Sequence, residues 1–124
     1  MPVAAAFAAD VVLVVVFAAT GRSSHDEALS VGGVAGTAWP FLVGLVAGWL
    51  IATAITHRFP LRWRTAWPVW VMTVAVGMVL RAATGAGTAT AFVIVATVTL
   101  GVLLIGWRVI AGLLPRERHT AASR

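Results

Sequence analysis

The sequence predicts an all-α polytopic membrane protein, an antiparallel bundle of four transmembrane helices, and three observations lead to this fold class. Of the 124 residues, 60% are hydrophobic and 10% are charged, and the mean hydropathy is +0.98. A typical soluble domain is about 45–50% apolar and about 25% charged. The polar residues cluster at intervals and leave four apolar segments of about 20 residues, the length that spans a bilayer. We therefore expect a single integral membrane domain over residues 1–124, with no room for a soluble catalytic domain.

The first apolar segment is predicted to form a helix over residues 2–20, interrupted by Asp10. A cleaved signal peptide is the alternative, because the alanine-rich stretch before Gly21 resembles a cleavage site. No basic side chain precedes this segment, however, and a carboxylate lies within it. We therefore favour a retained helix, followed by a polar loop over residues 21–33.

The remaining helices are predicted over residues 37–56, 66–83 and 88–114, with a disordered tail expected over residues 116–124. Two of these helices open with nearly the same tetrapeptide, Thr37-Ala38-Trp39-Pro40 and Thr65-Ala66-Trp67-Pro68. Threonine can cap a helix, proline is tolerated in the first turn, and tryptophan suits the level of the lipid headgroups. Both tetrapeptides are therefore interpreted as helix starts.

The placement of arginine predicts that both termini lie in the cytoplasm. The connection between the second and third helices and the C-terminal tail together carry six arginines: Arg58, Arg62, Arg64, Arg116, Arg118 and Arg124. The opposite side carries only Arg22 and Arg81, with Arg108 set aside because it falls within a span. Since basic residues accumulate on the cytoplasmic side, we expect a multi-pass protein of the cell membrane with both termini inside. The predicted interfacial anchors agree with this orientation: Trp39 on the outer side and Trp63, Trp67 and Trp107 on the inner side.

The formal charge of +5 comes from nine arginines, with no lysine. Because six of them flank apolar helices, they suit anionic lipid headgroups, and we expect the bilayer, not nucleic acid, as a partner. The absence of cysteine excludes disulfides, thiolate metal sites and cysteine nucleophiles. No histidine lies within a predicted span, and we find no phosphate loop, nucleophile elbow or paired carboxylates. We therefore expect no cofactor, no metal site and no catalytic residue.

Asp10 is the most informative residue, because it lies within a predicted span. A carboxylate there costs about 2.5–3.5 kcal/mol on insertion scales, so Asp10 should face the bundle. Arg81 and Arg108 both lie on stripes of small residues and are the candidate partners, and the sequence does not choose between them. The resulting charge constellation serves either as a proton or cation site or as a structural lock on helix packing. We favour the lock, because the sequence shows no other transport machinery.

A second group of polar residues, Arg22, His25 and Arg81, should gather at the outer face. There they can bind an anion or a lipid headgroup. The alternative is a solvated loop whose charge is neutralised by Asp26 and Glu27, and we favour this alternative on the local charge balance.

Small residues mark the predicted contacts between helices. Gly44 and Gly48 form a GxxxG motif, which permits close packing either within the chain or across a dimer. Gly77 and Gly101 lie on the stripes that also carry Arg81 and Arg108.

Through several of these residues and their order, the chain resembles a family of small prokaryotic membrane proteins catalogued as domain of unknown function 3054. The likeness runs from about residue 10 to residue 108. It rests on Asp10, Gly21-Arg22 with His25, Thr37-Ala38-Trp39-Pro40-Phe41, Gly77 with Arg81, Phe92-Val93-Ile94-Val95, and Gly106-Trp107-Arg108. The resemblance implies a four-helix membrane protein whose function is not established.

For function, we expect a non-enzymatic bundle that is transporter-like or binds a ligand, because no nucleophile, base and orienting group occur together. Four helices of about 10 Å diameter pack nearly solid, so a homo-oligomer is expected to supply the cavity. The alternative is a structural or accessory subunit of a larger membrane complex. Small multidrug-resistance transporters offer an analogy of architecture alone, and an arginine paired with Asp10 would quench the cation site that they need.

Single cysteines test the predicted topology, because the chain has no cysteine of its own. An impermeant thiol reagent applied to intact cells should label Ser24→Cys and spare Ser123→Cys, since these positions lie on opposite sides of the predicted bundle. Permeabilised cells, in which both variants label, are the control. The reverse pattern in intact cells would overturn the predicted orientation.

Overall fold

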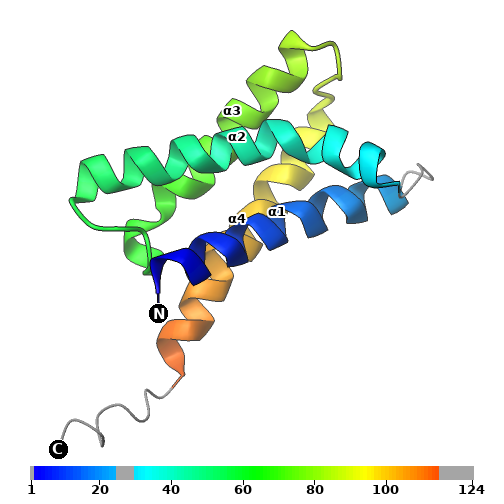
Figure 1. Cartoon of the computed structure of the whole chain (residues 1–124). Coiled ribbons are helices and arrows are strands. Elements are labelled where there is room, and N and C mark those ends of the chain that lie inside the picture. Colours follow the sequence, from blue (N-terminus) through cyan, green and yellow to red (C-terminus); the bar gives the residue numbers. More distant parts are fainter. Residues whose placement is uncertain (1, 25–29, 115–124) are drawn as a thin grey trace, which may run out of the picture.

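The apolar segments form four helices in the computed structural model, which describes residues 2–24 and 30–114 (Figure 1). A short 3-10 helix, η1, precedes the third of them. The elements are α1 (Val3–Ser24), α2 (Val31–Thr56), η1 (Trp63–Thr65), α3 (Trp67–Ala83) and α4 (Thr90–Leu113). The described residues contain no strand, so the predicted all-α fold class is confirmed. The tail over residues 116–124, for which disorder is predicted, lies outside the described residues.

Three of the helices, α1, α2 and α4, are long and apolar enough to cross a membrane. The apolar helix α3 has 17 residues. At 1.5 Å per residue α3 is about 26 Å long, near the lower limit for a transmembrane helix. The chain is therefore a multi-pass helical membrane protein, as its composition predicts.

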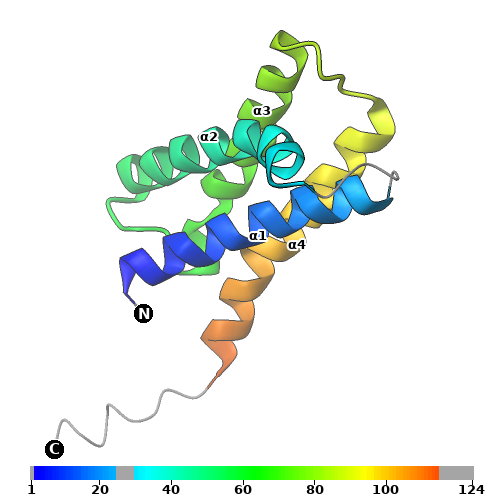
Figure 2. The same cartoon turned by 45° about the vertical axis from the view of Figure 1, so that its right-hand side comes forward.

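Successive helices run in opposite directions, so the bundle has two chemically distinct ends (Figures 1 and 2). The start of α1, the connection over residues 57–66 and the end of α4 lie together at what we call the terminal end. The end of α1, the start of α2 and the connection over residues 84–89 lie at the distal end. Helices α1 and α4 cross one another between these ends (Figure 2). Residues early in α1 and late in α4 are therefore brought to the same level.

Helix α2 begins at Val31, six residues before the predicted start. Its first N–H groups are capped by Ser30, whose hydroxyl oxygen accepts the N–H of Gly33 at 2.9 Å. Three glycines among the first six residues lower the helix propensity, which is why the sequence suggests a loop there. Pro40 consequently lies inside α2 and not in its first turn. Helix α1 likewise extends past its predicted end, to Ser24.

The start of α3 agrees with the sequence in one respect and differs in another. Pro68 lies in the first turn, where its missing N–H has no intrahelical acceptor to lose. Thr65 does not cap the helix, because Ala66 occupies the N-cap position. The Thr65 hydroxyl donates instead to the carbonyl of Arg62 at 3.2 Å, within the η1 turn.

The GxxxG motif of α2 packs against α3 of the same chain. A Cβ at Gly44 would lie 2.7 Å from the carbonyl oxygen of Met72, and one at Gly48 would lie 2.7 Å from the Cα of Val69. Both glycines therefore allow direct contact between the two backbones. The structure thus uses this motif within the chain, one of the two roles that the sequence allows.

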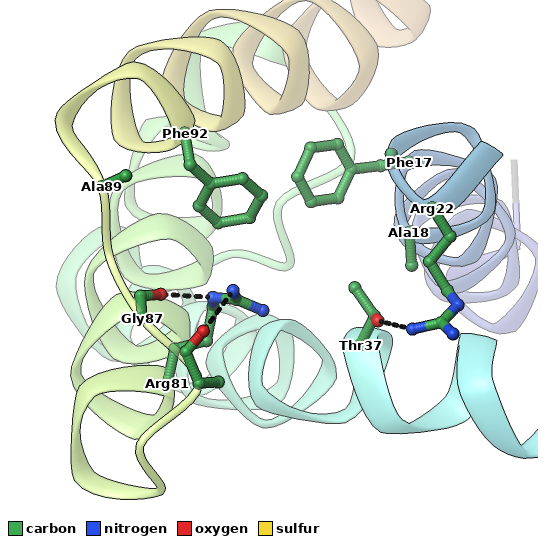
Figure 3. Close-up of a pocket in the computed structure, with 10 residues that line it drawn as sticks. Phe17, Ala18, Arg22, Thr37, Arg81, Gly87, Ala89 and Phe92 are labelled. Carbon is green, nitrogen blue, oxygen red and sulfur yellow. Dashed lines mark hydrogen bonds between the residues drawn. The ribbon is translucent and has the colours of Figure 1, made fainter. Parts of the chain in front are cut away.

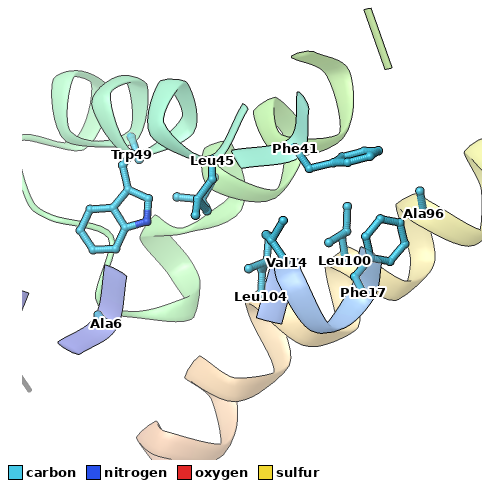
Figure 4. Packing of buried hydrophobic residues seen from close by; sticks show 11 residues of the cluster. Ala6, Val14, Phe17, Phe41, Leu45, Trp49, Ala96, Leu100 and Leu104 are labelled. Atoms are coloured by element: carbon cyan, nitrogen blue, oxygen red, sulfur yellow. The ribbon is translucent and has the colours of Figure 1, made fainter. Parts of the chain in front are cut away.

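The other two packing glycines accommodate aromatic rings. A Cβ at Gly77 would overlap the ring of Phe41, and one at Gly101 would lie 2.9 Å from the indole of Trp70. Phe41 in turn packs edge-on against Phe17, with ring centroids 5.3 Å apart. Buried side chains of α1, α2 and α4 meet around this contact (Figure 4). This core fills the middle of the bundle and separates the two ends.

Replacement of a backbone-contact glycine should destabilise the protein. We expect Gly44→Ala to lower the free energy of unfolding by about 1–3 kcal/mol, because the added methyl group meets the backbone of α3. The matched control is Gly106→Ala in α4, where a Cβ meets nothing within 4 Å and alanine favours the helix. Equilibrium unfolding in detergent measures both variants, and equal stability of the two would contradict the packing described here.

Candidate functional site

The two charges of the bundle interior, Asp10 and Arg108, form an ion pair between α1 and α4. Arg108 Nη2 lies 2.7 Å from Asp10 Oδ2, and Arg108 Nη1 lies 2.9 Å from Oδ1. This is the two-pronged geometry in which a guanidinium binds a carboxylate most strongly. Both residues are buried, Asp10 with 0% and Arg108 with 2% of its surface exposed. Arg108 is therefore the partner of Asp10.

Two tryptophans complete the coordination of the carboxylate. The indole N–H of Trp107 donates to Asp10 Oδ1 at 2.8 Å, and that of Trp49 donates to Oδ2 at 2.8 Å. Each carboxylate oxygen thus accepts two hydrogen bonds. None of the four donors can accept a hydrogen bond, because indole and guanidinium nitrogens only donate. If Asp10 carried a proton, its O–H group would point at another N–H donor and find no acceptor. This arrangement therefore fits an ionised carboxylate.

Arg108 also binds the backbone at the terminal end. Its Nε donates to the carbonyl of Pro60 at 2.8 Å, and Nη1 donates to the carbonyl of Leu104 at 2.8 Å. The guanidinium carbon lies 4.7 Å from the ring centroid of Trp107, a cation–π contact. The network therefore joins α1, α2, α4 and the connection that precedes η1. We call Asp10, Trp49, Trp107 and Arg108 the ion-pair network.

The distal end contains a pocket of about 270 Å³ formed by a single chain. Figure 3 shows Arg81 and Arg22 at opposite sides of it, the Arg22 guanidinium turned toward Thr37, and the rings of Phe17 and Phe92 facing each other nearby. Its lining comprises Phe17, Ala18, Gly21, Arg22, Thr37, Arg81, Ala86, Gly87, Ala89 and Phe92. The single chain thus contains a pocket of its own, and the homo-oligomer expected to supply a cavity stays a prediction.

Arg81 occupies the pocket wall and not the ion-pair network. Its Nε donates to the carbonyl of Gly87 at 3.0 Å and its Nη2 to that of Ala86 at 3.0 Å. The guanidinium carbon stands 4.4 Å from the ring centroid of Phe92. Within the described part of the chain, Nη1 has no hydrogen-bond acceptor and no carboxylate pairs with Arg81. The end of this guanidinium therefore retains donors for a ligand.

Arg22 reaches the pocket from α1. Its Nη1 donates to the hydroxyl of Thr37 on α2 at 3.1 Å, and it takes part in further interactions. The gathering of Arg22 with Arg81 agrees with the sequence, whereas His25, Asp26 and Glu27 lie outside the described residues. Thr37 was interpreted from the sequence as a helix cap. Its hydroxyl instead accepts the hydrogen bond from Arg22.

Two indole donors of the ion-pair network were not predicted from the sequence. Trp107 is predicted to be an interfacial anchor, yet its indole N–H donates to Asp10, as does that of Trp49. The available signal is their position, since Trp49 lies well inside a span and Trp107 adjoins Arg108. The other predicted anchors, Trp39, Trp63 and Trp67, expose 41%, 45% and 51% of their surface.

Double-mutant cycles test the pairing of the buried charges. We expect Arg108→Leu alone to cost about 3–5 kcal/mol of folding free energy, because it leaves Asp10 charged and buried, and Asp10→Asn in the same chain to recover part of this loss. The matched cycle of Asp10→Asn with Arg81→Leu should be additive within about 0.5 kcal/mol, since these residues lie at opposite ends. Unfolding in detergent provides the measurement. Additivity in the Asp10–Arg108 cycle would contradict the pairing.

Comparisons with known proteins bear on the family of this chain. Neither the comparison with curated proteins nor that with solved structures found a match. The model of the family described as "Protein of unknown function (DUF3054)" matches residues 7–111. The match includes the ion-pair network and the lining of the pocket. Because it covers most of the 124 residues, the chain belongs to the DUF3054 family.

Proposed function

We propose that this protein is a non-enzymatic ligand-binding bundle of the cell membrane, and that it binds a small anion in the distal pocket. The observation that carries the proposal is the presence of two arginines, Arg22 and Arg81, in the lining of one pocket, where Arg81 retains hydrogen-bond donors (Figure 3). Guanidinium groups bind carboxylates and phosphates through charge-assisted, often two-pronged hydrogen bonds. The Nε and Nη2 groups of Arg81 donate to the carbonyls of Gly87 and Ala86. These hydrogen bonds fix the orientation of the guanidinium and therefore of its remaining N–H donors.

The size of the pocket sets the size of the ligand. A volume of about 270 Å³ corresponds to roughly nine water molecules at about 30 Å³ each. Drug-sized ligands occupy pockets of about 300–1,000 Å³. The part of the proposed ligand that lies inside the pocket is therefore a single anionic group with at most a short substituent.

The ion-pair network supports ligand binding over cation or proton carriage. A carrier of the small multidrug-resistance type needs a carboxylate that exchanges its partner during each cycle. Each of the two carboxylate oxygens of Asp10 already accepts two hydrogen bonds from donors of the same chain. We therefore assign Asp10 a structural role in this proposal.

The orientation follows the arginine asymmetry of the sequence. With both termini in the cytoplasm, the distal end faces the outside, and the pocket receives its ligand from there. Binding needs no second copy of the chain, because one chain supplies every lining residue.

Stabilisation by inorganic phosphate tests this proposal. A phosphate concentration ten times the dissociation constant should stabilise the purified wild-type protein by about 1.4 kcal/mol and raise its melting temperature over that in chloride of equal ionic strength. Arg81→Gln should abolish the rise, because it removes the charged donors. Arg64→Gln, the matched loss of an exposed arginine at the terminal end, should retain it. An equal rise in all three proteins would be a general salt effect and would contradict the proposed site.

A further inference from the structure

We infer that the anion bound in the distal pocket is the headgroup of an amphiphile, a phosphate or carboxylate that carries an apolar chain. This inference rests on the proposed function, which requires only an anion. Three features of the pocket lead from the anion to the amphiphile: its level in the bundle, its closed floor and its limited volume.

The first feature is the level of the pocket along the helices. Arg22 follows Asp10 by twelve residues on α1, which is about 18 Å along the axis. It lies in the last turn of that helix, and Arg81 lies in the last turn of α3. Trp39, two residues after the pocket residue Thr37, exposes 41% of its surface, as expected of a side chain at the headgroup level. The cationic groups thus lie at the ends of apolar helices, the level at which lipid headgroups are expected.

The second feature is the aromatic floor. The rings of Phe17, Phe41 and Phe92 contact one another, with centroids 5.3 Å apart for Phe17–Phe41 and 6.3 Å apart for each of the other two pairs. Below this floor the core is filled by Val14, Ala96 and Leu100, all fully buried (Figure 4). A ligand therefore cannot extend into the bundle. Any chain attached to the anion must leave through the mouth of the pocket.

The third feature is the combination of volume and wall chemistry. A cavity of about 270 Å³ accommodates a headgroup and excludes its acyl chains. Apolar side chains, among them Ala18, Ala89 and Phe92, lie beside the two arginines in the lining. Such a mixed lining suits the junction between a charged group and a hydrocarbon chain better than it suits a fully hydrated ion.

Native mass spectrometry of the protein released from lipid nanodiscs tests this inference. Nanodiscs of equal parts phosphatidylglycerol and phosphatidylcholine supply an anionic and a zwitterionic lipid at the same concentration. We expect wild type to retain phosphatidylglycerol in preference to phosphatidylcholine. Arg81→Gln should weaken this retention about ten- to a hundredfold, as expected for the loss of hydrogen bonds from a charged group. Arg64→Gln should leave it unchanged, and Arg22→Gln serves in place of Arg81→Gln if the latter does not fold.

A second measurement separates this inference from the proposed function. Glycerol 3-phosphate presents a phosphate headgroup without acyl chains, and its affinity is measured with the same proteins in detergent. Weaker binding of glycerol 3-phosphate than of phosphatidylglycerol supports the amphiphile. Binding of glycerol 3-phosphate that depends on Arg81, without preferential retention of phosphatidylglycerol, would overturn the inference and leave the proposed anion site intact. Absence of both would overturn both.

Discussion

The pairing of Asp10 with Arg108 is the constraint on which the rest of the structure depends. In an apolar medium neither charge is tolerated alone, and breaking such a pair costs about 3–5 kcal/mol. The carboxylate therefore requires α4 beside α1, and the indole donors of Trp49 and Trp107 fix the rotation of the helices that carry them. The carbonyl of Pro60 brings the connection before η1 into the same network. One ion pair thus positions three helices and a connection.

The same faces of α1 and α4 carry both candidate sites. Along α1, the inward residues run from Asp10 through Val14 and Phe17 to Arg22. Along α4, they run from Arg108 through Leu104, Leu100 and Ala96 to Phe92. The ion pair holds these faces together at the terminal end, and because the helices cross, they leave the pocket at the distal end (Figure 2). A buried ion pair at one end and a pocket at the other support the proposed binding protein over a carrier that must open both ends.

Composition and residue pattern predicted the helices, their membrane character and the inward position of Asp10, because these properties depend on one segment at a time. The choice of Arg108 over Arg81 was not predictable, since both lie on small-residue stripes and only the crossing of α1 and α4 separates them. The start of α2 was misplaced because the Ser30 cap outweighs the glycines that follow it. The pocket was not predicted. The sequence placed Arg22 and Arg81 at the same end of the bundle, and both line the pocket, whereas the contribution of Phe92 depends on how α4 packs.

Infrared spectroscopy tests directly whether Asp10 is an ionised carboxylate held by four donors. Asp10 and Asp26 are the only aspartates of the chain, so Asp26→Asn leaves Asp10 as the sole aspartate. With aspartate ¹³C-labelled at its side-chain carboxyl carbon, the isotope-shifted carboxyl absorption of this variant belongs to Asp10 alone. At neutral pH we expect only the paired stretching bands of an ionised carboxylate. A labelled carbonyl band of a protonated carboxylic acid would contradict the lock and return Asp10 to the role of a proton carrier.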